Sequence, residues 1–317
     1  MKDFSFIPGM IEPIEQSILQ LACSEINLNP SDIFIEYGSF FGRSSNCIIE
    51  GIINNKTYTK NNILLVYDSF RCKSDMAFAK IVYQFARLGK VENLIEKDEN
   101  FINFINFRKI FNHFISSNAP IKVYECDLQE IKPVTQPIAF MHIDSPKFYS
   151  DFRYILINHF PSLKIGAIII FQDFFYHWSA SLIAIVELLI QKKFIEVNET
   201  AASSLKTTVL KKFDAQDIDE INDMMASIDI NKTIELSISR FSNQQNIIDR
   251  IHNFLPRLLL ANIQYYFEKG NILEANRHWD NYIKNYPQVE QSVINDFEEL
   301  KSYGFSIRSL YELDHNL

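Results

Sequence analysis

The stretch Ile35-Glu36-Tyr37-Gly38-Ser39-Phe40-Phe41-Gly42-Arg43-Ser44-Ser45 decides the fold of this chain. It follows an apolar run, residues 33–37, and leads into a helix-compatible segment, residues 46–53. Glycine adopts positive φ at little cost and lets the backbone approach a ligand, and a serine can cap the helix that follows. The stretch therefore predicts a strand, a tight turn and a helix. A turn without a ligand is the alternative interpretation.

Working outward, short apolar runs alternate with amphipathic segments from about residue 30 to residue 213. The runs are residues 33–37, 63–68, 121–126, 138–144 and 167–172. Near-continuous apolar runs are typical of parallel strands that helices cover on both faces. The pattern predicts an α/β fold with a doubly wound, mostly parallel sheet. The last two runs, 194–197 and 207–211, lie too close together for a helix, so they predict an antiparallel hairpin at one edge.

Beyond residue 213 the strand pattern stops, and we expect three regions. These are an N-terminal helical segment (1–29), a ligand-binding sheet domain (30–213) and an all-helical C-terminal region (214–317). Helices are expected at residues 215–228, 246–254, 256–269, 272–286 and 287–303.

One part of the helical region resembles a single tetratricopeptide-like hairpin. The residues that carry the spacing are Tyr266, Gly270, Ala275, Trp279 and Pro287. We expect the region to pack on its own chain or on a twin subunit. A docking surface for a protein partner within residues 256–303 is the alternative.

The composition narrows the classes of partner. The chain has 317 residues, is 47% hydrophobic and carries a net charge of −8. An acidic chain without a block of Lys and Arg is not expected to bind nucleic acid. No apolar run approaches the roughly 18–20 residues of a membrane span. The acidic residues Glu12 and Glu15 near the start of the sequence argue against a signal peptide. The cysteines form no CxxC pair, so we expect reduced thiols and a cytoplasmic location.

Acidic side chains end or follow three of the predicted strands, at the sheet edge where ligands bind in such folds. They are Glu36, Asp68 and Asp127. Asp68 is placed to accept hydrogen bonds from two ribose hydroxyls, and Asp127 to meet an adenine amino group. The alternative is that these acids only cap helices. Because G-x-G-x-x-G is absent, an acid-rich site suits a cofactor with ribose and a positive centre, such as S-adenosylmethionine (SAM).

Two more acids, Asp144 and Asp173, end the fourth and fifth strands. With Gln172 they could bind Mg²⁺ through oxygen ligands, or either acid could be a general base towards a substrate hydroxyl. His142 shares a strand face with Asp144 because it lies two residues earlier, and His177 lies in the loop after the fifth strand. Both histidines are catalytic candidates, with a structural hydrogen-bonding role as the alternative.

These motifs resemble those of class I SAM-dependent methyltransferases. The closest similarity is to the macrocin-type sugar O-methyltransferases and the cephalosporin-hydroxylase-like group. The family motif E-x-G-x-x-x-G-x-S matches residues 36–44, and a strand ending in D-T-F matches Asp68-Ser69-Phe70. The motifs I-D-G-D and D-D-Y correspond to Ile143-Asp144-Ser145-Pro146 and Gln172-Asp173-Phe174.

The resemblance implies roles for single positions. The residues expected to line the SAM site are Glu36, Gly38, Ser39, Gly42, Ser44, Asp68, Ser69, Asp127 and Asp144. Asp144 and Asp173 would be metal ligands or the base beside the acceptor. Because Gln172 and Pro146 replace two family acids, Mg²⁺ is expected to bind weakly, if it binds at all.

The sequence thus predicts a SAM-dependent O-methyltransferase that acts on a hydroxyl of a sugar or another small polar metabolite. The alternatives are an N-methyltransferase, a SAM-binding domain with little or no activity that serves as a scaffold, and a nucleotide-dependent oxidoreductase. The resembling group implies carbohydrate or natural-product biosynthesis in a bacterium, and a homo-oligomer.

Overall fold

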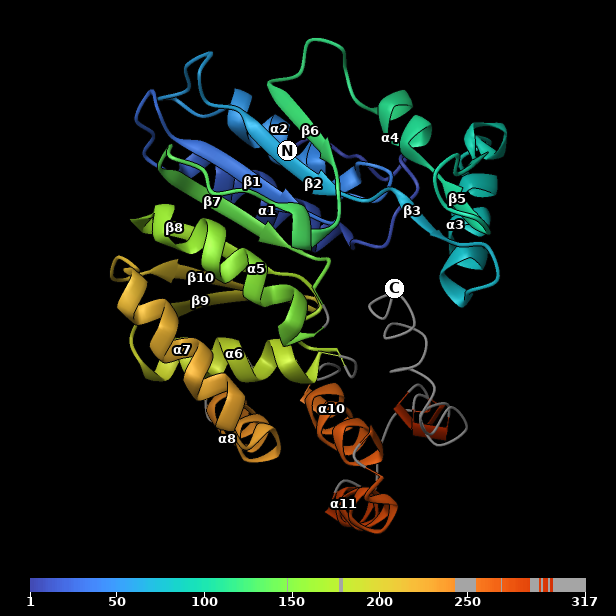
Figure 1. The fold of residues 1–317 in the computed structure, drawn as a ribbon, viewed down its shortest axis with the longest axis vertical. Helices are drawn as coiled ribbons and strands as arrows, with labels where there is room; N and C mark the ends of the chain where they lie inside the picture. Colours follow the sequence, from blue (N-terminus) through green and yellow to red (C-terminus); the bar gives the residue numbers. More distant parts are fainter. Residues whose placement is uncertain are drawn as a thin grey trace.

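The computed structural model describes residues 1–146, 148–176, 179–242, 255–268, 270–285, 291, 293–295 and 297–298. A seven-stranded sheet with helices on both faces forms its centre (Figure 1). The strand order is β6-β2-β1-β7-β8-β10-β9. From β6 through β2, β1 and β7 to β8, neighbouring strands are parallel. Strand β10 runs antiparallel to both β8 and β9. The predicted doubly wound α/β sheet with an edge hairpin is confirmed.

The parallel strands form where the sequence is apolar on both faces. They are β1 (Ile33–Tyr37), β2 (Leu64–Asp68), β6 (Ile121–Glu125), β7 (Ile138–Ile143) and β8 (Leu163–Phe171). The hairpin consists of β9 (Ile195–Ala201) and β10 (Ser204–Val209). Every residue of β1 and β7 is buried, as expected for central strands covered on both sides.

Two groups of helices cover the two faces. Helices α1 (Pro13–Glu25) and α2 (Arg43–Ile53) share a core with Phe34 and Val66. The opposite face, with Ile35 and Tyr37, shares a core with α5 (Tyr149–His159), α6 (Ala180–Gln191), α7 (Ala215–Ser227) and α8 (Ile230–Ser242). Successive residues of a strand point to opposite faces, so neighbours in β1 belong to different cores.

An insertion between β2 and β6 was not predicted. It contains β3 (Arg71–Lys73), α3 (Ala77–Leu88), η1 (Glu92–Leu94), β4 (Glu96–Lys97), β5 (Phe104–Asn106) and α4 (Arg108–Phe114). Its strands form a second, three-stranded sheet, β3-β5-β4. In Figure 1 this lobe lies beside the carboxyl ends of β2 and β6. Strands of two or three residues are too short to give a periodic signal.

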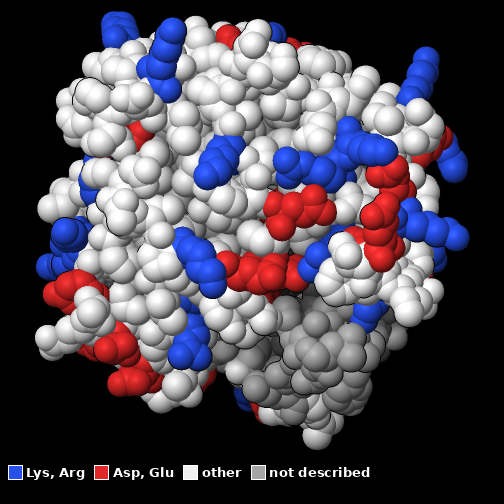
Figure 2. All heavy atoms as spheres, turned by 45° about the horizontal axis from the view of Figure 1, so that its top comes forward, with Lys and Arg blue, Asp and Glu red and all other residues white. Residues whose placement is uncertain are grey.

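Two further short helices complete the sheet domain. They are η2 (Leu128–Glu130) and η3 (Phe160–Ser162). No helix in the described part of the chain is both long and apolar enough to cross a membrane. Acidic and basic side chains are interspersed over the face shown in Figure 2.

After residue 214 the described chain is helical, but the prediction missed α8. This helix packs on α6 through Glu187, a fully buried carboxylate. Arg240 Nη2 lies 2.6 Å from Glu187 Oε1, and the Ser237 hydroxyl donates to Glu187 Oε2 at 3.1 Å. An arginine and a hydroxyl thus satisfy the buried acid.

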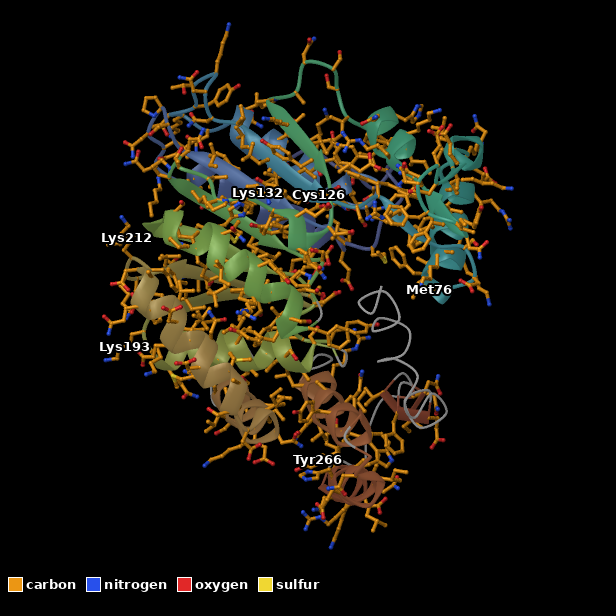
Figure 3. All side chains as sticks on the ribbon, in the orientation of Figure 1. Met76, Cys126, Lys132, Lys193, Lys212 and Tyr266 are labelled. Atoms are coloured by element: carbon orange, nitrogen blue, oxygen red, sulfur yellow. The ribbon has the colours of Figure 1, made fainter. Side chains whose placement is uncertain are left out.

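A helical hairpin occupies the region of tetratricopeptide-like spacing. It consists of α10 (Leu255–Glu268) and α11 (Ile272–Asn285), and Gly270 between them has φ of 73°. Ala275 is fully buried, and the ring of Trp279 stacks on Phe297 with 3.9 Å between centroids. Tyr266, labelled in Figure 3, lies on α10. The predicted helix at 246–254 lies wholly outside the described residues, as does much of 287–303.

Candidate functional site

The glycine turn of the motif lies at the carboxyl end of β1. Gly38 and Gly42 both have left-handed backbone conformations, with φ of 79° and 90°. A Cβ atom on Gly38 would come within 2.9 Å of the backbone nitrogen of Ser145. Only glycine leaves room for this approach. The turn after β1 and the loop after β7, which begins with Asp144, therefore lie against each other.

Asp68, at the end of β2, stabilises the glycine turn. Its Oδ2 accepts hydrogen bonds from the backbone N–H groups of Ser39 (2.8 Å) and Phe40 (3.0 Å), and from the Ser39 hydroxyl (3.3 Å). Its Oδ1 accepts from the Phe70 N–H at 2.7 Å. Burial raises the pKa of Asp68, and these hydrogen bonds oppose the shift. Because a carboxylate offers about four acceptor positions, Oδ1 retains capacity for another donor.

The acid after β6 has a different environment. Asp127 forms an ion pair with Arg71 of the insertion, whose guanidinium lies 4.0 Å from the centroid of the Phe101 ring. Asp127 also forms a capping box with Glu130 at the start of η2. Cys126, labelled in Figure 3, marks this end of β6. The capping alternative is thus observed for Asp127, and its adenine contact stays a prediction.

Glu36, the acid of the motif, does not reach the surface of the sheet edge. Its side chain is completely buried, and it accepts a hydrogen bond from Ser45 of α2. Its Oε1 lies 3.2 Å from Nδ1 of His142 on β7. The carboxylate therefore joins β1, α2 and β7. Ser44, beside Ser45, is buried, whereas Ser69 is half-buried after Asp68.

His142 is also completely buried, between two oxygen acceptors. Its Nδ1 faces Glu36, and its Nε2 lies 3.5 Å from Oε1 of Gln172. Burial by itself lowers a histidine pKa, but the hydrogen bond and charge of Glu36, with smaller contributions from Asp144 and Gln172, outweigh it, so the pKa of His142 is raised. The imidazolium form, with two N–H donors, matches both neighbours.

Gln172 uses both ends of its amide within this buried region. Its Nε2 donates to Glu15 Oε1 at 3.0 Å and to the Ser203 hydroxyl at 3.3 Å. Its Oε1 lies 2.8 Å from the Ser204 hydroxyl, whose single proton is shared with Glu15 Oε1 at the same distance. A metal ligand needs a free oxygen aimed at the ion, and the amide oxygen of Gln172 is already engaged.

The Mg²⁺ site predicted from Asp144, Gln172 and Asp173 is therefore not supported. The engaged amide of Gln172 does not fit the ligand role. In the described ranges, no group of three or more His, Cys, Asp or Glu residues could hold a metal ion.

Asp144 and Asp173 follow the neighbouring strands β7 and β8, as the sequence predicted. The Asp144 N–H donates to the carbonyl of Tyr37 at 3.0 Å. Asp173 has a left-handed backbone, with φ of 57°, and its Oδ1 lies 3.3 Å from the Ser203 hydroxyl. Both acids are partly exposed at the carboxyl edge of the sheet. His177, the fourth catalytic candidate, lies outside the described residues.

Sequence reasoning missed Glu15, which reaches this region from α1. Burial raises its pKa to about 7, against opposing hydrogen bonds from the Glu12 N–H and the two serine hydroxyls. One signal was available. Glu15 falls in line with Ile11, Ile18 and Leu19 at helical spacing, so a charged residue occupies an apolar stripe.

No family model matches the chain, and no curated protein matches it. Among solved structures, it is similar to the O-methyltransferase NovP at 13% identity and a TM-score of 0.44, over 64% of this chain and 83% of that one. It is also similar to apo CalS11, a TDP-rhamnose 3'-O-methyltransferase of calicheamicin biosynthesis, at 14% identity and a TM-score of 0.39, over 62% and 77%. A Bacillus cereus O-methyltransferase in complex with SAH matches at 13% identity and a TM-score of 0.37, over 65% and 86%. The fold itself is given by the strand order of this chain.

Proposed function

We propose that the chain is a SAM-dependent methyltransferase that transfers a methyl group to a hydroxyl of a sugar or another small polar metabolite. The observation that carries the proposal is the contact between two strand-end loops. The left-handed Gly38 turn lies against Ser145, next to Asp144, while Asp68 supports the turn from the neighbouring strand. In open α/β sheets, ligands bind at this edge.

The residues present fit the cofactor. Gly38 and Gly42 leave the turn backbone without side chains at its two ends, and Oδ1 of Asp68 has acceptor capacity for a ribose hydroxyl. When bound, SAM supplies an electrophilic methyl group on a sulfonium. Glu36 acts indirectly, because it is buried beneath the turn with Ser45.

On the acceptor side, this chain has to align a hydroxyl and take up its proton. Asp144 and Asp173 are the partly exposed carboxylates at the ends of β7 and β8, and either can accept that proton. Asp144 is the first candidate because it adjoins Ser145, which touches the glycine turn. His142 is assigned a supporting role, since it is completely buried. No step is routed through a metal.

Calorimetric binding of SAM and S-adenosylhomocysteine tests the proposal. We expect micromolar binding by the wild type. Asp68→Asn should weaken it by about 1–3 kcal/mol, because a ribose hydroxyl then loses a charged acceptor. Glu25→Gln, an exposed change at the end of α1, is the matched control and should leave affinity unchanged. Absence of binding to either ligand would overturn the proposal.

Transfer of a labelled methyl group to panels of sugars, nucleotide-linked sugars and small amines then identifies the acceptor. Asp144→Asn should lose turnover and retain SAM affinity. Transfer only to amines would replace the proposal with an N-methyltransferase. Binding without transfer to any acceptor would favour a SAM-binding scaffold.

A further inference from the structure

A continuous group of buried polar side chains connects α1 to the loop after β8. Its members are Glu15, Glu36, Ser45, His142, Gln172, Ser203 and Ser204. None exposes more than 8% of its surface. Buried polar groups are costly unless they bind one another. We call this set the buried polar network.

Donors and acceptors in the network match for only one of the two orientations of the Gln172 amide. With His142 as an imidazolium, its Nε2–H faces the carbonyl of Gln172, and the amide N–H₂ of Gln172 faces Glu15 and Ser203. The reversed amide would put N–H₂ against N–H on one side and carbonyl against carboxylate on the other. The pair Glu36–His142 and the acid Glu15 therefore fix the orientation of Gln172 from both sides.

Ser203 links Glu15 to Asp173, the second of the two candidate bases. Its hydroxyl lies 3.0 Å from Glu15 Oε1 and 3.3 Å from Asp173 Oδ1. A serine has one proton to donate, so the two carboxylates share a single donor. The Phe175 N–H also donates to the Ser203 carbonyl at 3.0 Å. The loop of Asp173 is thus tied to Ser203 on both sides of Phe174.

The position of Glu15 depends in turn on how α1 packs. A Cβ atom on Gly51 of α2 would come within 2.5 Å of the Gln20 carbonyl, so the two helices cross closely. Arg43, the first residue of α2, donates to the carbonyls of Ile7 (2.5 Å) and Ile11 (3.0 Å). The residue that follows the glycine turn therefore holds the segment that carries Glu15.

We propose that Glu15 is a positioning residue for Asp173, which makes the N-terminal segment part of the acceptor side of the site. The proposal rests on the proposed function. Gln172 directly precedes Asp173, and Ser203 contacts its carboxylate, and both bind Glu15. Glu15 thus fixes a left-handed residue from two directions without touching substrate itself.

The test compares Glu15→Gln with Glu25→Gln, the same chemical change at the exposed end of the same helix. The first readout needs no acceptor: hydrogen exchange of the peptide 172–176, which includes the Phe175 amide. We expect exchange to rise about tenfold in Glu15→Gln, because a neutral amide oxygen replaces the charged acceptor of Gln172 and Ser203, and the amide N–H₂ would face the Glu12 N–H. Affinity for S-adenosylhomocysteine should stay within about twofold of the wild type.

The second readout is methyl transfer to the acceptor found in the panels. We expect kcat to fall about tenfold in Glu15→Gln with KM for SAM unchanged. The wild-type kcat should also change near pH 7, and this change should disappear in Glu15→Gln. Among the residues that the structure describes, the groups that act on Glu15 are Asp173, Gln172, Ser203, Ser204 and the Glu12 backbone. Of these, only Asp173 is another ionisable side chain.

Ser203→Ala supplies a second, milder variant. It keeps Glu15 and removes the shared hydroxyl, so loop exchange should rise and kcat should fall in the same direction. If Glu15→Gln matches Glu25→Gln in loop exchange, the inference is overturned. If it raises exchange throughout the chain and lowers cofactor affinity equally, Glu15 is merely structural, which also overturns it. Failure of the wild type to bind either cofactor form overturns the proposed function and leaves the exchange test of Glu15 valid.

Discussion

Two completely buried histidines, His142 and His159, lie on opposite faces of the same sheet, and their pKa values move in opposite directions. His142 lies on the face of α1 and α2, between Glu36 and Gln172, and its pKa is raised. His159, at the end of α5, lies on the other face, and burial lowers its pKa to about 4.

The partners explain the difference. Nε2 of His159 lies 2.8 Å from the carbonyl of Lys132, so it carries the proton. Its Nδ1 then accepts from the hydroxyl of Tyr37, a buried ring that stacks on Tyr67. Neutral partners match a neutral ring, and the hydrogen bond to the Lys132 carbonyl only partly offsets the loss of solvation that a charge would suffer.

The comparison teaches that burial alone does not set the charge of a histidine. A carboxylate in contact outweighs burial for His142, whereas a carbonyl and a phenol do not for His159. The histidine with the raised pKa lies next to the candidate site, and the one with the lowered pKa lies in an aromatic core. Three experiments can break or sharpen this contrast.

The largest effect is expected for Glu36→Gln. It removes the charge that keeps His142 protonated, so the pKa of His142 should fall below its ordinary value. Breaking a buried pair costs about 3–5 kcal/mol, and we expect the lower end because imidazole can release its proton. Urea unfolding at pH 6 and a titration of the His142 ring by NMR measure both effects. A decrease in unfolding free energy below about 1 kcal/mol would show that Glu36 is not the partner that stabilises the charged form of His142.

The second effect is a pH response. The unfolded chain protonates His159 near pH 6.5, but the folded chain resists until about pH 4. Stability from this residue is therefore lost as pH falls between these values, by on the order of 3 kcal/mol. The pKa values of His142 and Glu15 are raised instead of lowered. The stability that these two residues contribute therefore grows as pH falls.

Comparing the wild type with a variant at His159 separates the contribution of His159 from those of His142 and Glu15. His159→Gln keeps a donor and an acceptor but cannot titrate. The difference in unfolding free energy between wild type and His159→Gln should therefore shift against the wild type as pH falls from 7 to 4. A difference that stays flat with pH would contradict a neutral His159.

The smallest effect is expected for Tyr37→Phe. The change leaves Nδ1 of His159 buried without its donor, which costs about 1–3 kcal/mol at pH 7. Tyr83→Phe, on a tyrosine of α3 that is 41% exposed, is the matched control and should cost less than about 0.5 kcal/mol. Equal losses in the two variants in urea unfolding would mean that the hydroxyl of Tyr37 contributes nothing.

Local patterns predicted much of the sheet. The apolar runs placed all five parallel strands and the edge hairpin, since burial on both faces leaves a continuous apolar signature. Positive φ was expected for Gly38 and is observed there, and Gly42, which was expected only to leave room at the start of the helix, adopts it as well. The insertion sheet and α8 were missed, because very short strands and a largely polar helix give weak signals.

The site was harder to predict because its contacts join distant residues. Gln172 was expected to face a metal, yet it binds Glu15, which is 157 positions away. Glu36 was expected around the cofactor, but it is buried against His142. Alternation along β1 separates Glu36 from Tyr37, but it does not say which helix covers each of them.

The sequence by itself determined the chain order of the strands of the main sheet and the positions of the glycine turn and the strand-end acids. These depend on side-chain polarity and backbone freedom within a few residues. Only the tertiary structure decided which acids stay at the edge, which are buried, and which histidine has a raised pKa. Those outcomes depend on desolvation and on partners brought together by the sheet register and by the packing of α1, and both effects act across the whole chain.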